Sequence, residues 1–125
     1  MTTVLFKYQS NGDDYLVCDL EKNHVVLDAR AVRKICSRNF GIGSAGLVAG
    51  SVTEGTMAVY SPEGDDLDCD ETAKSVFSCY LEDAGYRHGR RQDEKRPALV
   101  GKVFLTDDFV RRNELMTGDM SGGKW

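Results

Sequence analysis

The residues best suited to chemistry lie in one acidic segment, residues 64–81, with the sequence GDDLDCDETAKSVFSCYL. Cys69 and Cys79 are candidate nucleophiles or proton-transfer groups, because a thiolate can act as either. Carboxylates crowd Cys69, and nearby negative charge suppresses the thiolate form that would react. We therefore expect carboxylates, rather than thiols, to carry any chemistry here. The carboxylates are Asp65, Asp66, Asp68, Asp70 and Glu71.

A mostly antiparallel sheet and two helices are expected to hold that segment. Alternating apolar residues predict a β-hairpin over residues 3–19 and further strands at residues 47–49, 56–60 and 99–105. Asp28 is suited to cap a helix over residues 28–38. A second helix is expected to start near Asp70 or Glu71 and to end at Gly85. These elements predict one α+β domain over residues 1–125, with an irregular tail from about residue 107.

Composition and charge limit the class of protein. The chain has 125 residues, is 41% hydrophobic and 29% charged, and carries a formal net charge of −4. An acidic balance disfavours a nucleic-acid-binding protein, which normally carries a basic surface. No apolar stretch approaches the ~20 residues that span a bilayer, and the first residues do not resemble a secretion signal. We therefore expect a cytoplasmic protein with reduced cysteines and with no membrane or nucleic-acid partner.

Several other features are expected to have no special function. Residues 41–46 (GIGSAG) resemble a dinucleotide-binding fingerprint, but they precede a strand rather than a helix. His24 and His88 have no ligands at coordinating spacing, so we expect no metal and no other cofactor. The basic run at residues 87–91 is expected to be a solvated loop, although it could bind a carboxylate or phosphate. The acidic residues would also be favoured by the dipole of a helix that starts there.

Three segments, taken in order, resemble the N-terminal half of diaminopimelate epimerase. Residues 7–19 (KYQSNGDDYLVCD) resemble the family's opening K-x-H-G-x-G-N-D-F-x-x-x-D. Residues 33–47 (RKICSRNFGIGSAGL) are similar to its R-x-x-x-x-R-x-x-G-I-G-A-D-G-L segment, and residues 60–64 (YSPEG) stand where the family has F-N-A-D-G. The resemblance spans roughly residues 4–105. It implies a single half-domain of that family, with a mostly antiparallel sheet wrapped around a central helix.

The departures from the family pattern bear on function. Without a gap in the alignment, the family's catalytic cysteine falls on Asp70, and Cys69 lies one residue early. The G-N-G segment that would bind a substrate carboxylate through backbone amides becomes residues 71–73 (ETA). The substrate-binding asparagines fall on Asp13 and Ser61. The resemblance also implies a second half with an opposing cysteine, so we expect a homodimer to complete the two-lobed shape.

More loosely, the size and pattern resemble the small proteins that form lysinoalanine in duramycin- and cinnamycin-type lanthipeptide biosynthesis. This resemblance implies a peptide-tailoring enzyme that adds a lysine amine of a peptide substrate to dehydroalanine and protonates the α-carbon, without pyridoxal phosphate or another cofactor. An acidic pocket would attract the ammonium group. A base must deprotonate it, or the peptide supplies its own base and the protein mainly positions it.

Two other functions stay open at this point. One is a cofactor-independent amino-acid epimerase or racemase that uses Cys69. The other is a non-catalytic peptide-binding module. Under the cyclisation hypothesis the catalytic candidates are Asp70, Glu71 and Asp66. The groove and the peptide carboxylate would be contacted by Tyr8, Gln9, Asp13, Ser44, Ser61, Glu63, Thr72, Arg33 and Arg87.

Overall fold

The computed structural model describes residues 2–23, 27–37, 44–87 and 96–106. The expected irregular tail, both histidines and residues 88–91 of the basic run lie outside the described residues. The first two glycines of the 41–46 segment, Gly41 and Gly43, also lie outside them.

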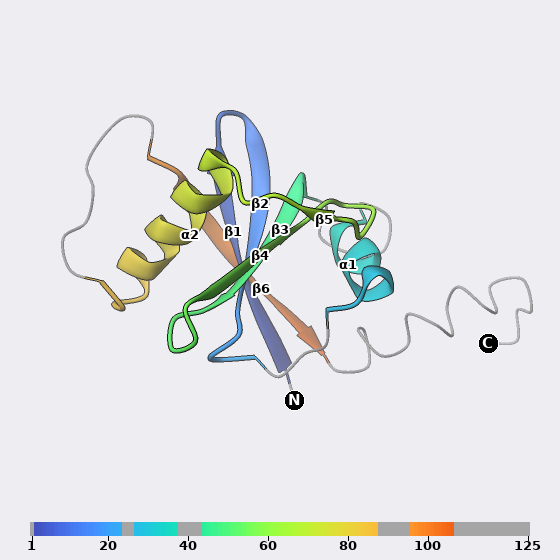
Figure 1. Ribbon diagram of the computed structural model, residues 1–125, viewed down its shortest axis with the longest axis horizontal. Coiled ribbons are helices and arrows are strands. Elements are labelled where there is room, and N and C mark those ends of the chain that lie inside the picture. Colours follow the sequence, from blue (N-terminus) through green and yellow to red (C-terminus); the bar gives the residue numbers. More distant parts are fainter. Residues whose placement is uncertain (1, 24–26, 38–43, 88–95, 107–125) are drawn as a thin grey trace, which may run out of the picture.

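A six-stranded sheet with the order β5-β4-β3-β2-β1-β6 forms the body of the domain (Figure 1). Its strands are β1 (Thr2–Ser10), β2 (Asp13–Asp19), β3 (Gly46–Ser51), β4 (Thr56–Tyr60), β5 (Asp66–Leu67) and β6 (Ala98–Thr106). Every neighbouring pair is antiparallel except β2 and β3, which run parallel. The mostly antiparallel α+β architecture expected from the sequence is therefore confirmed. It is consistent with a single half-domain of the epimerase-like kind.

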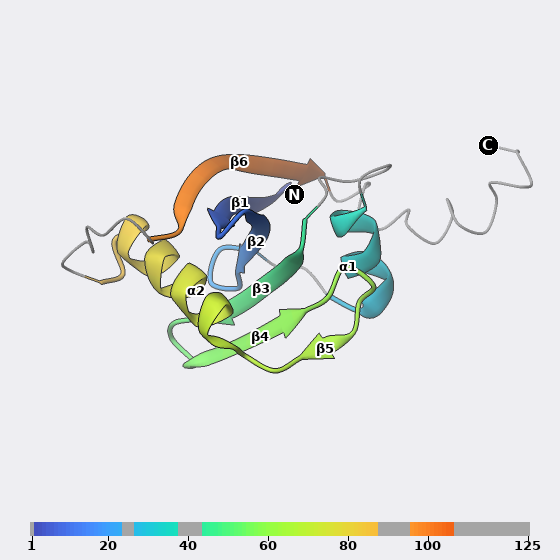
Figure 2. The ribbon, with the colours of Figure 1, turned by 90° about the horizontal axis from the view of Figure 1, so that it is seen from above.

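The two helices, α1 (Ala29–Cys36) and α2 (Glu71–Asp83), lie against opposite faces of the sheet (Figure 2). Successive side chains of a strand point to opposite faces, so each strand contributes to both cores. Leu16 of β2 packs with α1, whereas its neighbour Val17 packs with α2. Burial of one such side chain contributes about 1.5–3 kcal/mol. The two cores therefore fix both helices relative to the strands.

Local sequence signals explain where the elements begin and end. The β1–β2 hairpin closes through Asn11 and Gly12, which both have positive φ (53° and 86°), as a two-residue turn of the primed type requires. Asp28 caps α1 by accepting the Ala31 N–H at 2.8 Å. Gly85, with a φ of 88°, follows the end of α2 as expected. The first helix ends at Cys36, two residues earlier than the sequence predicted, and the two-residue strand β5 was not predicted.

The position of α2 depends on a close approach to Gly50 in β3. A Cβ atom built on Gly50 would lie 2.5 Å from Phe77 Cζ and 2.9 Å from the Thr56 carbonyl oxygen. Both distances are too short for any side chain, so only glycine lets the Phe77 ring approach the strand this closely. This contact sets how α2 crosses the sheet and hence where its first turn lies.

Candidate active site

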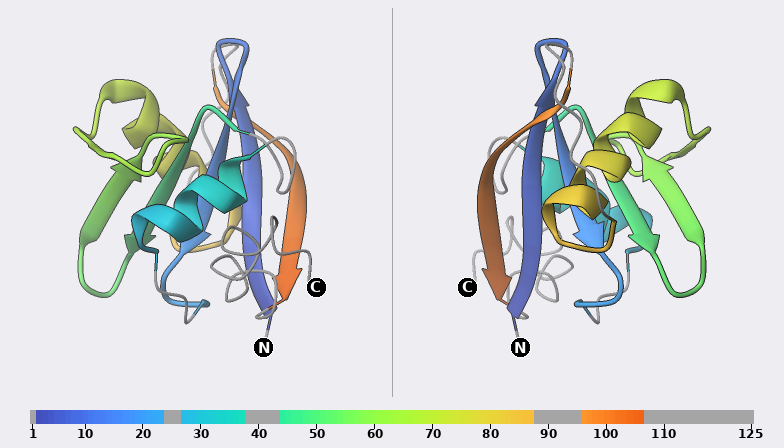
Figure 3. Two further views of the ribbon diagram at one scale, coloured as in Figure 1. Left: turned by 90° about the vertical axis from the view of Figure 1, so that its right-hand side faces the viewer. Right: turned by 90° about the vertical axis from the view of Figure 1, so that its left-hand side faces the viewer.

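The first turn of α2 lies at the end of the sheet from which the β1–β2 hairpin projects (Figures 1 and 3). The chain reaches this turn from β4 through a tight loop at residues 61–65 and then through β5. Ser61 organises the loop, because its hydroxyl accepts hydrogen bonds from the Glu63 and Asp65 amides at 3.2 and 3.1 Å. Glycine is needed at position 64, where φ is 92° and a Cβ would lie 2.6 Å from the Ala29 carbonyl oxygen of α1.

Asp70 is the N-cap of α2, which begins at Glu71, one of the two start positions expected from the sequence. Its Oδ1 accepts the Ala73 N–H at 2.8 Å, and its backbone carbonyl accepts the Lys74 N–H at 3.0 Å. Among the described residues, Oδ2 has no hydrogen-bond partner, and neither do the amides of Glu71 and Thr72. The side chain is exposed. Asp70 therefore presents one oriented carboxylate oxygen beside two backbone donors.

The Cys69 thiol is directed toward the core and β4. Its half-buried Sγ packs against the core between α2 and the sheet and donates to the Met57 carbonyl of β4 at 3.6 Å. The other three cysteines are free and buried. Burial raises the pKa of the Cys18 thiol to about 12 and also raises that of Cys36. Within the described residues, no thiol lies at the N-cap of α2, where Asp70 presents its carboxylate.

The Tyr15 hydroxyl of β2 is influenced by charges from both the hairpin and the start of α2. Burial raises the pKa of this hydroxyl, and the charges of Asp13 and Asp70 raise it further. Both carboxylates therefore lie within electrostatic reach of one phenol, which stays protonated at neutral pH. The ring packs beside β3, where its carbon atoms lie 3.5 and 3.6 Å from the position of a Cβ on Gly46. The sequence alone does not mark Tyr15 as a site residue, although it follows the aspartate pair of the 7–19 segment, where the family has a phenylalanine.

The other exposed candidates are spread over several elements around this end of the sheet. Asp66 lies on β5, and Glu71 lies on the first turn of α2, 4.0 Å from the Lys74 amine. Gln9 and Asp13 lie on the hairpin. These side chains leave an excess of negative charge near the helix start. Thr72 is half-buried on the first turn of α2.

The expected carboxylate-binding arginines lie apart from each other. Arg33 of α1 donates to the Glu63 carbonyl at 3.4 Å, which holds α1 next to the loop at residues 61–65. Arg87 follows α2 at its other end and donates to the Ser78 hydroxyl at 2.9 Å.

Two groove candidates are buried and bonded within the protein. Ser44 donates to the Gly46 carbonyl at 2.6 Å and accepts the Gly46 amide at 3.0 Å, which shapes the entry to β3. The Tyr8 hydroxyl donates to Asp83 at 2.6 Å near the far end of α2. Burial, followed by the hydrogen bond to Asp83, raises the pKa of Tyr8. No pattern in the sequence indicates that these two hydroxyls point inward.

No group of three or more histidine, cysteine, aspartate or glutamate side chains in the described residues is arranged to hold a metal ion. No described helix has the length and apolar character needed to cross a bilayer.

Two diaminopimelate epimerases are among the curated proteins that this chain is similar to. Diaminopimelate epimerase 2 of Nostoc sp. (strain PCC 7120) is 32% identical over 84 residues, which cover 64% of this chain and 30% of the relative. The diaminopimelate epimerase of Leptospira biflexa serovar Patoc is 29% identical over 122 residues, which cover 91% of this chain and 42% of the relative. No family model matches the chain.

The chain spans less than half the length of these relatives. The similarity supports a distant relationship to the epimerases and agrees with the α+β half-domain. It favours the epimerase hypothesis over lysinoalanine formation, because both relatives carry the name of an epimerase and neither that of a peptide cyclase.

Proposed function

We propose that this domain takes part in cofactor-independent proton transfer at the α-carbon of an amino acid, as an epimerase or racemase does, with Asp70 as the acid–base group. The observation that supports this most directly is the position of Asp70. In the ungapped register of the sequence resemblance, Asp70 falls at the position of the family's catalytic cysteine. In the structure it holds an exposed carboxylate at the N-cap of α2.

The geometry around Asp70 suits a proton transfer of this kind. The Ala73 amide fixes Oδ1, which leaves Oδ2 oriented and free to take or give a proton. Removing the α-proton places negative charge on the substrate's α-carbon and, by delocalisation, on its carboxylate oxygens. The amides of Glu71 and Thr72, together with the helix dipole, favour negative charge at that point. Tyr15, protonated at neutral pH, adds a hydroxyl within electrostatic reach of Asp70.

Epimerisation needs an acid and a base on opposite faces of the α-carbon. Asp70 supplies a group for one face. In this proposal the opposing group comes from another domain or from a second copy of the chain. Exchange of the α-proton with solvent needs only one face, so it can be measured even where inversion is incomplete.

The first test is incubation of the purified protein in D₂O with a panel of amino acids that includes the stereoisomers of diaminopimelate. NMR or mass spectrometry then measures deuterium at the α-carbon. The proposal expects incorporation faster than in buffer for at least one member of the panel. Background exchange with the whole panel would reject it.

A second candidate function is lysinoalanine formation on a lanthipeptide, for which the supporting observation is the exposed carboxylates near the helix start. Asp66, Asp70 and Glu71 would attract a lysine ammonium, and a carboxylate could deprotonate it before attack on dehydroalanine. The test uses a dehydroalanine-containing precursor peptide. Because the cross-link leaves the mass unchanged, loss of the free lysine amine is the signal. Peptide binding without any loss of the amine would point instead to a non-catalytic peptide-binding module.

A further inference from the structure

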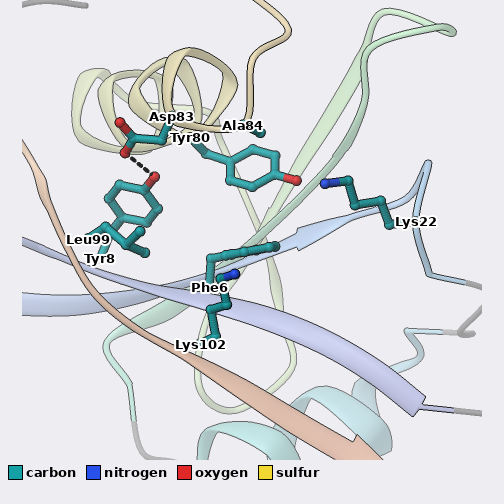
Figure 4. A pocket seen from close by; sticks show the side chains of 8 residues that line it. All are labelled: Phe6, Tyr8, Lys22, Tyr80, Asp83, Ala84, Leu99 and Lys102. Carbon is teal, nitrogen blue, oxygen red and sulfur yellow. Dashed lines mark hydrogen bonds between the residues drawn. The ribbon is translucent and has the colours of Figure 1, made fainter.

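A separate pocket lies beside the C-terminal end of α2, on the face of the sheet that α2 covers (Figure 4). Asp83 lines it, and Asp70 lies 13 residues earlier at the other end of the helix, about 20 Å away at 1.5 Å per residue. The pocket is therefore distinct from the candidate active site. Its lining consists of Phe6, Tyr8, Lys22, Tyr80, Asp83, Ala84, Leu99 and Lys102.

The floor of this pocket is aromatic. The Phe6 and Tyr80 ring centroids are 4.8 Å apart, and the Tyr8 ring lies beside them in Figure 4. Leu99 from the edge strand β6 adds an apolar side chain that is 41% exposed. The volume is about 280 Å³. A cavity of about 150 Å³ is enough for benzene, so this pocket has room for one substituted ring but not for a large cofactor.

Two lysines make the pocket favour a negatively charged ligand. The Lys22 amine lies 5.9 Å from the Tyr86 ring centroid, and the Lys102 amine lies 5.9 Å from the Phe6 ring centroid. Within the described residues neither amine has a carboxylate within ion-pair distance. Aromatic faces hold the two ammonium groups in place and leave their hydrogens available to a ligand.

The carboxylate of Asp83, which also lines the pocket, does not cancel the preference for a negatively charged ligand. Asp83 accepts from the Tyr8 hydroxyl at 2.6 Å and from Arg96 at 2.9 Å, so each of its oxygens already accepts a hydrogen bond. The same Arg96 nitrogen lies 3.5 Å from a Glu82 carboxylate oxygen. A ligand amine would have to compete for Asp83 with the Tyr8 hydroxyl and Arg96, whereas a ligand carboxylate would find two ammonium groups that have no carboxylate partner among the described residues.

We propose that this pocket binds a small carboxylate with an aromatic body. The ring packs on Phe6 and Tyr80, and the carboxylate lies between Lys22 and Lys102. This inference does not depend on the activity proposed for Asp70.

The test is a titration of the ¹⁵N-labelled full chain with phenylacetate, with benzylamine and acetate as matched probes. Phenylacetate should give saturable amide shifts centred on Tyr8, Ala84 and Leu99, and the two other probes should bind at least about fivefold more weakly. Lys22→Gln and Lys102→Gln should each weaken phenylacetate binding about two- to fivefold, as expected for a partly exposed ion pair.

Two further variants complete the test. Lys74→Gln removes a lysine from the opposite end of α2 and should leave phenylacetate binding unchanged. Ala84→Met should fill the pocket and abolish the saturable shifts. Equal binding of benzylamine and phenylacetate, or full binding by the two pocket-lysine variants, would overturn the proposal. An absence of saturable shifts in the unmodified chain would do the same.

Discussion

Replacement of Asp70 should separate its structural role from its chemical one. The carboxylate caps α2 through a 2.8 Å hydrogen bond from Ala73. Asp70→Ala removes this bond, which costs about 1 kcal/mol within a range of about 0.5–2. It also removes a negative charge that the helix dipole stabilises by about 0.3–1 kcal/mol. Asp70→Asn keeps the capping oxygen and loses only the charge.

Neighbouring carboxylates reduce the cost of losing that charge. Asp66, Asp68 and Glu71 are all exposed nearby, and their repulsion of Asp70 is relieved in either variant. We therefore expect Asp70→Asn to keep nearly the stability of the unmodified chain. Asp70→Ala should lose about 1 kcal/mol, which lowers the melting temperature by about 4 °C for a domain of this size.

The assay is denaturant and thermal unfolding of both variants, with Asp28→Ala as the matched control. Asp28 caps α1 with the same 2.8 Å geometry, so its removal should cost a similar free energy. It lies on the opposite face of the sheet and should leave proton transfer unaffected. Equal destabilisation by Asp70→Asn and Asp70→Ala, or no loss in Asp70→Ala, would refute this account of the cap.

Three other outcomes are expected. Gly50→Ala should destabilise the domain by about 1–3 kcal/mol in denaturant unfolding, since its Cβ would overlap the Phe77 ring. Gly101→Ala, with open space at the Cβ position, should be close to neutral, and equal effects of the two changes would contradict this packing. Partial burial and a hydrogen bond to Asp19 raise the pKa of Tyr86 to about 12. The stability that this phenol contributes is complete below the ordinary pKa of about 10 and is lost as the pH rises from about 10 to 12, so unfolding of Tyr86→Phe should be less sensitive to pH in that window. In native-state alkylation followed by mass spectrometry, Cys69 should be modified before the three buried cysteines, and earlier modification of Cys18 would contradict its burial.

The parts of the fold that could be predicted depend on local chemistry. The Asn11–Gly12 turn, the Asp28 and Asp70 caps and the glycine after α2 each involve residues a few positions apart, so the sequence alone indicates them. The strand β5 could not be predicted, because its two exposed residues carry no alternating pattern.

The site was less predictable, because it depends on contacts between distant segments. The parallel pairing of β2 with β3 brings Tyr15 beside Gly46, and the crossing of α2 brings Asp70 within reach of the same phenol. No pattern in the sequence indicates that Tyr15 and Asp70 come within reach of each other. The hydroxyls of Tyr8 and Ser44 were expected in a groove, but whether a hydroxyl faces solvent or a buried acceptor is decided only by packing.

The most direct test of the central claim compares α-carbon deuterium exchange catalysed by Asp70→Asn and Cys69→Ala, on a substrate for which the unmodified protein is active. The account predicts that Asp70→Asn, still capped and folded, loses at least about 100-fold in rate, as expected when a positioned acid–base group is removed. Cys69→Ala, which removes only a thiol turned toward Met57, should retain the rate. Full activity in Asp70→Asn together with loss of activity in Cys69→Ala would contradict the claim and place the chemistry on the thiol.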